Sequence, residues 1–175
     1  KVRKKDTIYC SYNEKGELTL SGEGIAITEY EYDDNGNEIC RRFFDKNNKP
    51  TKGYIGFAQK AYTYDDKGHM LSERYYDTKN NLILVDGIAG NNYKRDGHGN
   101  IIEEFPIGID QKMAKGKLIF RYKYDDKDNL IEFAVFDEDG RPTTDSNDIH
   151  KYTQKFNNRN QCIETCYYNT KGELT

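Results

Sequence analysis

The chain has 175 residues, of which 35% are hydrophobic and 33% are charged, and its formal net charge is −3 at pH 7. Charges of both signs are spread along it without a basic stripe, which argues against a nucleic-acid partner. No apolar run approaches the roughly 18 residues that a membrane span needs, so we expect no membrane insertion of this segment.

The aromatic residues, 15 tyrosines and 8 phenylalanines, are placed regularly along the chain. Disordered segments lack aromatic residues, so this pattern indicates a folded protein. A chain this polar cannot fill a thick apolar core. It favours a thin structure in which each repeat packs mainly on its neighbours.

The chain starts with a short basic stretch, residues 1–5, which we interpret as a mature or cut end. The first repeat signal is residues 10–19 (C-S-Y-N-E-K-G-E-L-T), and residues 166–175 (C-Y-Y-N-T-K-G-E-L-T) nearly copy it. Because repeat arrays normally need polar capping units, we expect the array to continue in a longer parent protein. A chain trimmed at a repeat boundary is the alternative.

Motif A has the form Tyr-x-Tyr-Asp-Asp-x-Gly-Asn and first occurs at residues 30–37. The separation is 32 residues from Tyr32 to Tyr64 and from Tyr124 to Phe156, and it slips to 31 and then 29 around Arg95, which stands in a degenerate copy. Motif A therefore occurs five times at a period near 32 residues.

Motif B has an aromatic residue and an Asp before a turn, as in residues 75–81 (Y-Y-D-T-K-N-N). The copy expected near Phe105 has lost its Asp. We predict one repeat domain, residues 1–175, with about five copies of a 32-residue unit of two hairpins. The aromatic residue of motif B falls at Tyr12, Phe44, Tyr76, Phe136 and Tyr168.

Both motifs predict hairpin turns, because Asp side chains bond the backbone two residues on and Gly accepts a positive φ. The runs between the turns are rich in Tyr, Phe, Ile and Thr, which favour strands. We predict an all-β fold of tandem β-hairpins that form an elongated, twisted antiparallel sheet, a meander of roughly ten short strands. A β-solenoid built from the same hairpins is the alternative.

Two segments deviate from this regular pattern. Residues 24–26 (G-I-A) recur as residues 56–58 and 87–89, and their small side chains predict a bend or a close backbone approach. Residues 108–116, where the period slips, are expected to form a short helix or an irregular loop.

Strand alternation predicts one aromatic face, with the two tyrosines of each motif A, and one polar face. Stacked tyrosines near Asp and Asn could bind sugar rings, but the simpler interpretation is that they form the shared core between copies. The candidate binding residues are Tyr30, Tyr62, Tyr93 and Tyr122 in one column, with Tyr32, Tyr64 and Tyr124 beside them.

The loops of motif A resemble calcium loops, since carboxylates and amides crowd a Gly turn. Residues 33–37 are too few, however, and no distal bidentate Glu follows, so we interpret these loops as plain turns. We expect no metal site and no cofactor. No Ser-His-Asp order, glycine-rich phosphate loop or pair of catalytic carboxylates stands out, so we predict no catalytic residue and no enzyme.

The four cysteines, Cys10, Cys40, Cys162 and Cys166, are expected to be free thiols, with a disulfide framework or a zinc site as alternatives. Cys162 and Cys166 would lie about 13 Å apart on one strand, which is too far for a disulfide. The three histidines are expected to be surface residues, two of them in turns, namely His69, His98 and His150.

Motif A resembles the YD (Rhs-like) repeat of bacterial surface and toxin-carrier proteins, although its period near 32 residues is longer than that family's. Motif B looks like the aromatic hairpins of cell-wall- or glucan-binding repeats, but those carry tryptophan and this chain has none. The alternation of the two motifs resembles uncharacterised tandem-repeat proteins of anaerobic bacteria. These resemblances imply a secreted or surface setting and no known enzyme activity.

We therefore predict a non-catalytic repeat module of a bacterial surface or exported protein, in an extracellular, cell-surface or periplasmic location. It would act as a scaffold or a protein-interaction surface. The alternatives are a carbohydrate- or cell-wall-binding module that uses exposed tyrosine columns, and a fragment of a toxin-encapsulating shell. The sequence does not identify the protein or glycan partner.

Overall fold

The computed structural model describes residues 6–175, and the basic start, residues 1–5, lies outside them. The described part contains eleven strands and no helix, so none of it is a helix that could cross a membrane. The strands are β1 (Thr7–Cys10), β2 (Ile27–Tyr32), β3 (Glu38–Phe44), β4 (Gln59–Tyr64), β5 (Met70–Tyr76), β6 (Gly90–Arg95), β7 (Ile101–Ile107), β8 (Ile119–Tyr124), β9 (Leu130–Phe136), β10 (Lys151–Phe156) and β11 (Cys162–Tyr168).

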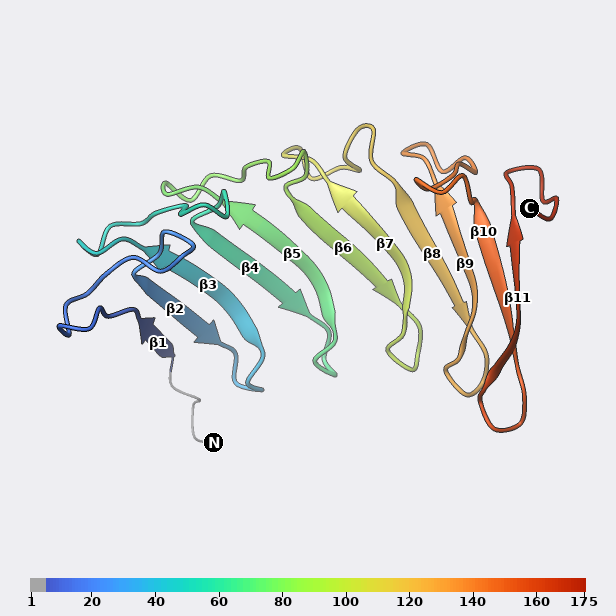
Figure 1. The fold of residues 1–175 in the computed structure, drawn as a ribbon, viewed down its shortest axis with the longest axis horizontal. Helices are drawn as coiled ribbons and strands as arrows, with labels where there is room; N and C mark the ends of the chain where they lie inside the picture. The colour runs from blue at the N-terminus through green and yellow to red at the C-terminus, as the bar shows by residue number, and fades with distance from the viewer. Residues whose placement is uncertain (1–5) are drawn as a thin grey trace. The chain divides into compact units, whose positions relative to one another are not determined.

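The sheet order is the chain order, from β1 to β11, and the strand pairs are antiparallel (Figure 1). The predicted all-β meander of hairpins is therefore confirmed. The alternative, a β-solenoid, is not formed, because each strand pairs with its neighbours in the sequence.

The chain divides into two compact units. The first contains the residues up to Asn91 together with Gly108–Gln111, and so includes β1 to β5 and the start of β6. The second contains Asn92–Ile107 and Lys112–Thr175, and so includes the rest of β6 and β7 to β11. A single repeat domain over residues 1–175 stays a prediction.

The hairpins of motif A share one irregularity. The register shifts just before the second aromatic residue of the motif, where a β-bulge leaves one residue unpaired and increases the local twist. The sequence repeat is thus also a repeat of backbone geometry. The shift falls between Glu31 and Tyr32, Thr63 and Tyr64, Lys123 and Tyr124, and Lys155 and Phe156.

Motif B forms a tight turn closed by a single bridge rather than a long hairpin. Phe44 bridges Pro50 in the first unit, and Phe136 bridges Pro142 in the second. The copy that has lost its Asp still makes the bridge, between Ile107 and Met113. Residues 108–116 form an irregular loop without a helix.

The buried core is thin, as the composition predicts. Three buried alanines of the first unit end the G-I-A segment and its copies, and their carbonyls accept backbone hydrogen bonds from the preceding copy. The bend or close backbone approach predicted there stays a prediction. The backbone N–H groups of Ser11, Phe43 and Tyr75 donate to the carbonyls of Ala26, Ala58 and Ala89, respectively, at 2.9–3.0 Å.

We expect Ile107→Ala to lower the free energy of unfolding by about 2–5 kcal/mol, because the fully buried side chain leaves a cavity when truncated. The matched control is Ile163→Ala, since Ile163 is 64% exposed and such surface changes stay within about 0.5 kcal/mol. Urea denaturation measures both variants. Equal losses in the two variants would contradict the burial of Ile107.

Candidate functional site

One five-residue turn recurs throughout the chain, and residues 33–37 show its geometry. The backbone N–H of Asp33 donates to the carbonyl of Asn37 at 2.9 Å, and the N–H of Gly36 donates to the carbonyl of Asp33 at 3.0 Å. Oδ1 of Asp33 accepts the N–H groups of Asn35 and Asn37 at 2.9 and 2.8 Å. The carboxylate therefore satisfies two backbone donors that no strand partner reaches.

Motifs A and B both use this turn, and the first residue is Asp or Asn in them except in the copy after Ile107, where Gly108 stands there. The fourth residue has a positive φ, which favours Gly but is tolerated by Asn and Asp. Asn48, Asn80, Asp128 and Asn160 stand there with φ of 57–64°. The first residues are Asn13, Asp33, Asp45, Asp65, Asp77, Asp96, Asp125, Asp137, Asn157 and Asn169.

Sequence analysis missed two further copies of this turn, at residues 21–25 and 145–149. Ser21 replaces Asp in the first, and its hydroxyl accepts the N–H of Glu23 at 3.2 Å. Asp145 accepts the N–H of Asn147 at 2.8 Å in the second. The available signal in the sequence was Asp145 followed three residues later by Asp148. In the structure Asp148 is the fourth residue of the turn and has a φ of 59°.

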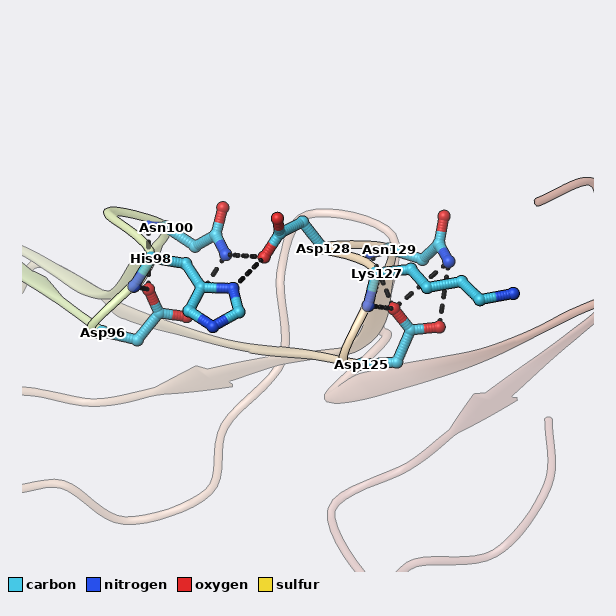
Figure 2. Close-up of polar contacts among 7 residues, drawn as sticks. All are labelled: Asp96, His98, Asn100, Asp125, Lys127, Asp128 and Asn129. Atoms are coloured by element: carbon cyan, nitrogen blue, oxygen red, sulfur yellow. Dashed lines mark hydrogen bonds and ion pairs between the residues drawn. The ribbon is translucent and has the colours of Figure 1, made fainter.

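In the second unit, neighbouring copies of the turn touch through their side chains (Figure 2). Oδ1 of Asp128, the fourth residue of its turn, lies 2.7 Å from Nδ2 of Asn100 and 2.8 Å from Nδ1 of His98. Nδ2 of Asn129 in turn lies 3.5 Å from Oδ1 of Asn160. The last Asn of motif A thus binds the next copy as well as its own turn.

These contacts set the charge states of the turn. The hydrogen bond and the charge of Asp128 raise the pKa of His98 above its ordinary value. Asn100 and His98 lower the pKa of Asp128 in return. In the first unit, the backbone N–H and the ring of His69 lower the pKa of Asp65 to about 2.

The aromatic face of the second unit carries a row of rings across four strands. Tyr122, Phe133, Tyr152 and Tyr167 lie opposite one another in register on β8 to β11. Their ring centroids are 5.4, 5.2 and 6.1 Å apart in that order. Aromatic pairs at such distances contribute about 0.5–1.5 kcal/mol each beyond the area they bury.

In the first unit, rings and a guanidinium make the cross-strand contacts of the aromatic face. Tyr9 packs edge-on against Tyr30 at 5.4 Å, and the guanidinium of Arg41 lies 4.7 Å from the Tyr30 ring on the other strand pair. Phe57, from the loop before β4, has its ring 5.7 Å from Phe43 and 4.9 Å from Tyr75.

The predicted tyrosine columns lie on the motif A strands, and all their side chains are half-buried. Burial raises the pKa of Tyr62 to about 12, and it also raises the pKa of Tyr122. The hydroxyl of Tyr64 donates to the carbonyl of Glu38 at 2.7 Å, which ties β4 to β3. A binding role for Tyr30, Tyr32, Tyr62, Tyr64, Tyr93, Tyr122 and Tyr124 stays a prediction.

The opposite face is polar, as alternation predicts. Its register column carries Glu31, which pairs with Arg42 at 2.7 Å, and Lys123, which pairs with Glu132 at 2.8 Å. The same position is exposed in the four later copies of motif A, and in two of them, at Thr63 and Lys123, the exposed residue stands between two half-buried tyrosines. The polar-face residues of these two hairpins, Glu31 and Lys123, therefore take part in ion pairs.

The ring face also holds ion pairs. Arg41 pairs with Glu38 while lying over the ring of Tyr30. Lys60 likewise pairs with Glu73 while lying over the ring of Tyr62.

The remaining candidate groups are scattered. All four cysteines are free, and burial raises the pKa of Cys40. His150 is not a surface residue as predicted; it is buried, because it occupies the place that Ala takes in the G-I-A segments. Among residues 6–175, no group of three or more His, Cys, Asp and Glu side chains is placed to hold a metal ion.

We expect Asp125→Ala to lower the melting temperature, because two backbone N–H groups lose their acceptor. Asp125→Asn should change it far less, since Asn13, Asn157 and Asn169 take the same place in other copies. Differential scanning calorimetry measures both. Equal losses would show that the negative charge, rather than the acceptor oxygen, holds the turn.

We expect Asp128→Asn to lower the pKa of His98, and Asp126→Asn to lower it less, because Asp128 is the direct partner. Because folding raises this pKa, the stabilisation is full below the ordinary value of about 6.5 and is lost as pH rises through the folded value. NMR titration of the ring protons measures the pKa. A larger effect of Asp126→Asn would contradict the contact.

Comparisons with known proteins bear on the fold. No protein-family model matches the chain, and no curated protein matches it. A chain in the crystal structure of TcdB2-TccC3-Cdc42 is similar, with a TM-score of 0.56 at 16% identity over 91% of this chain and 7% of that chain. A chain in the structure of a Photorhabdus luminescens Tc holotoxin pore has a TM-score of 0.45 at 14% identity, over 94% of this chain and 10% of that one.

This chain therefore spans a small part of the length of these neighbours. At 16% identity, the likeness to the TcdB2-TccC3-Cdc42 chain is a likeness of fold. The hairpin meander described here is accordingly an architecture shared with a chain of the TcdB2-TccC3-Cdc42 structure.

Proposed function

We propose that this chain is a non-catalytic repeat module that serves as a scaffold or protein-interaction surface in a bacterial surface or exported protein. We assign it to an extracellular, cell-surface or periplasmic setting, as a long-period relative of the YD (Rhs-like) repeats.

The observation that carries this proposal is the packing of the aromatic face. In the second unit Phe133 lies between Tyr122 and Tyr152, with ring centroids 5.4 and 5.2 Å away. In the first unit the hydroxyl of Tyr64 is engaged by a carbonyl of the preceding copy. Rings and hydroxyls used in this way join copies to one another, so they stabilise an extended sheet rather than present a ligand platform.

The similarity in fold supports the same conclusion. The TcdB2-TccC3-Cdc42 chain devotes only 7% of its length to the matching region, so the fold occurs there as a small part of a much larger polypeptide. A hairpin array in which each copy packs on the next is suited to be such a structural part of a larger protein. The first residue recurs as Asp in most copies of the turn, and its carboxylate accepts backbone N–H groups, a pattern that fits structure better than catalysis.

Tyrosine-selective nitration followed by mass spectrometry tests the scaffold function. We expect Tyr62 and Tyr122 to react much more slowly than Tyr54, which is 84% exposed, because burial raises the pKa of both and so lowers their phenolate fraction. Tyr54 is the internal control for reagent and time.

The same experiment is repeated with chitohexaose and with cellohexaose. We expect neither oligosaccharide to change the rates. Fast nitration of Tyr62 and Tyr122, together with protection by either sugar, would overturn the scaffold function in favour of carbohydrate binding.

A further inference from the structure

A hollow of about 480 Å³ lies on the polar face of the second unit, across β6 to β9. Its charged lining includes Lys94, Arg121 and Lys123, and its apolar lining includes Ile102, Ala134 and Phe136. The Arg121 guanidinium lies 4.2 Å from the centre of the Phe136 ring. We call this hollow the cationic groove.

In the ion pairs of the groove, the cations outnumber the carboxylates and are more exposed. Glu103 is shared by Lys94 at 2.5 Å and Arg121 at 2.7 Å, and Glu132 is shared by Lys123 at 2.8 Å and Lys151 at 3.8 Å. Three cations of the lining, and Lys151 outside it, therefore share two carboxylates, which leaves a local surplus of positive charge in a chain whose net charge is −3.

The carboxylates are the buried members of these pairs. Glu103 and Glu132 are 15% and 24% exposed at their side chains, whereas Lys123 is 69% exposed. Although burial opposes the shift, hydrogen bonds from Lys94 and Arg121 hold the pKa of Glu103 below its ordinary value. The more exposed cations lie over these glutamates, so the groove presents positive charge to the solvent.

The acidic turn beside the groove does not neutralise it. Gly140 of this turn lies close to the Arg121 guanidinium, but Asp137 and Asp139 pair with Arg141 at 3.9 and 2.7 Å. Glu138 accepts the backbone N–H of Gly116. The carboxylates of the turn are therefore engaged elsewhere.

We propose that the cationic groove binds an acidic peptide segment in an extended conformation. Arg121 and Lys123 alternate along β8, so their side chains project from the same face about 6.6 Å apart. Acidic side chains at alternate positions of an extended peptide repeat at the same spacing. An apolar residue next to them would lie against Ile102 and Phe136.

A peptide fits this groove better than a rigid anionic polymer. The lining combines cations with an aromatic ring and aliphatic groups, a mixture that suits a segment with both acidic and apolar side chains. Tyr122 of the tyrosine columns also lines the groove, but the cations that would recognise the peptide lie on the polar face. This proposal therefore goes beyond the scaffold function.

Fluorescence anisotropy with a labelled peptide, E-A-D-A-E-L-G, tests the groove, and the amide peptide Q-A-N-A-Q-L-G is its neutral counterpart. We expect the acidic peptide to bind, and its affinity to fall between 0.05 and about 0.5 M salt because exposed charges are screened. We expect no binding of the neutral peptide. Absence of acidic-peptide binding at low salt would overturn the proposal.

The decisive variant is Lys123→Glu, which should weaken binding by about fivefold to tenfold, because an attraction becomes a repulsion. Lys155→Glu is the matched control. Lys155 has the same register position in motif A, the same 69% exposure and a similar partner, Glu164 at 2.6 Å, but it lies outside the groove. We expect it to leave binding unchanged.

Lys123→Gln serves if Lys123→Glu fails to fold, and circular dichroism checks each variant. An equal loss in Lys155→Glu would show nonspecific charge attraction and overturn the site. Tighter binding of polygalacturonate or single-stranded DNA than of the peptide, lost in Lys123→Glu, would overturn the peptide as the occupant.

Discussion

The five-residue turn is the constraint on which the rest of this structure depends. Its first residue accepts two backbone N–H groups through one side-chain oxygen, and its fourth residue adopts a positive φ. Such turns set the hairpin register, since loop geometry determines which residues face each other across two strands. Every alignment of rings and ion pairs on the two faces follows from it.

The aromatic rows provide what the thin core cannot. In each unit few side chains are fully buried, and many of those are alanines. Cross-strand rings such as Tyr122 and Phe133 bury area on one face while their strands stay short. The ion pairs of the other face cost little to form in water and keep that face solvated. The fold therefore needs no second layer over the polar face.

The two faces of the sheet differ in what their side chains do. The aromatic face joins copies, whereas the polar face keeps side chains such as Lys94 and Lys123 available to solvent. Repeat proteins typically use stacked units for stability and an exposed surface for binding. The proposed scaffold with a partner site on its charged face is consistent with both features and with a similar fold inside the much longer chain of the TcdB2-TccC3-Cdc42 structure.

The sequence by itself determined the turns, the strands and the two faces, because these depend on local hydrogen bonds and on a period of two residues. It did not determine which side chains meet across copies. His98 and Asp128 are 30 residues apart, and their contact depends on how adjacent turns align. Likewise, Phe133 lies between Tyr122 and Tyr152 because a second strand separates successive motif A strands, and His150 is buried because tertiary packing places it where other copies have Ala. Only the tertiary structure decides such contacts, since long-range register and burial leave no local signal.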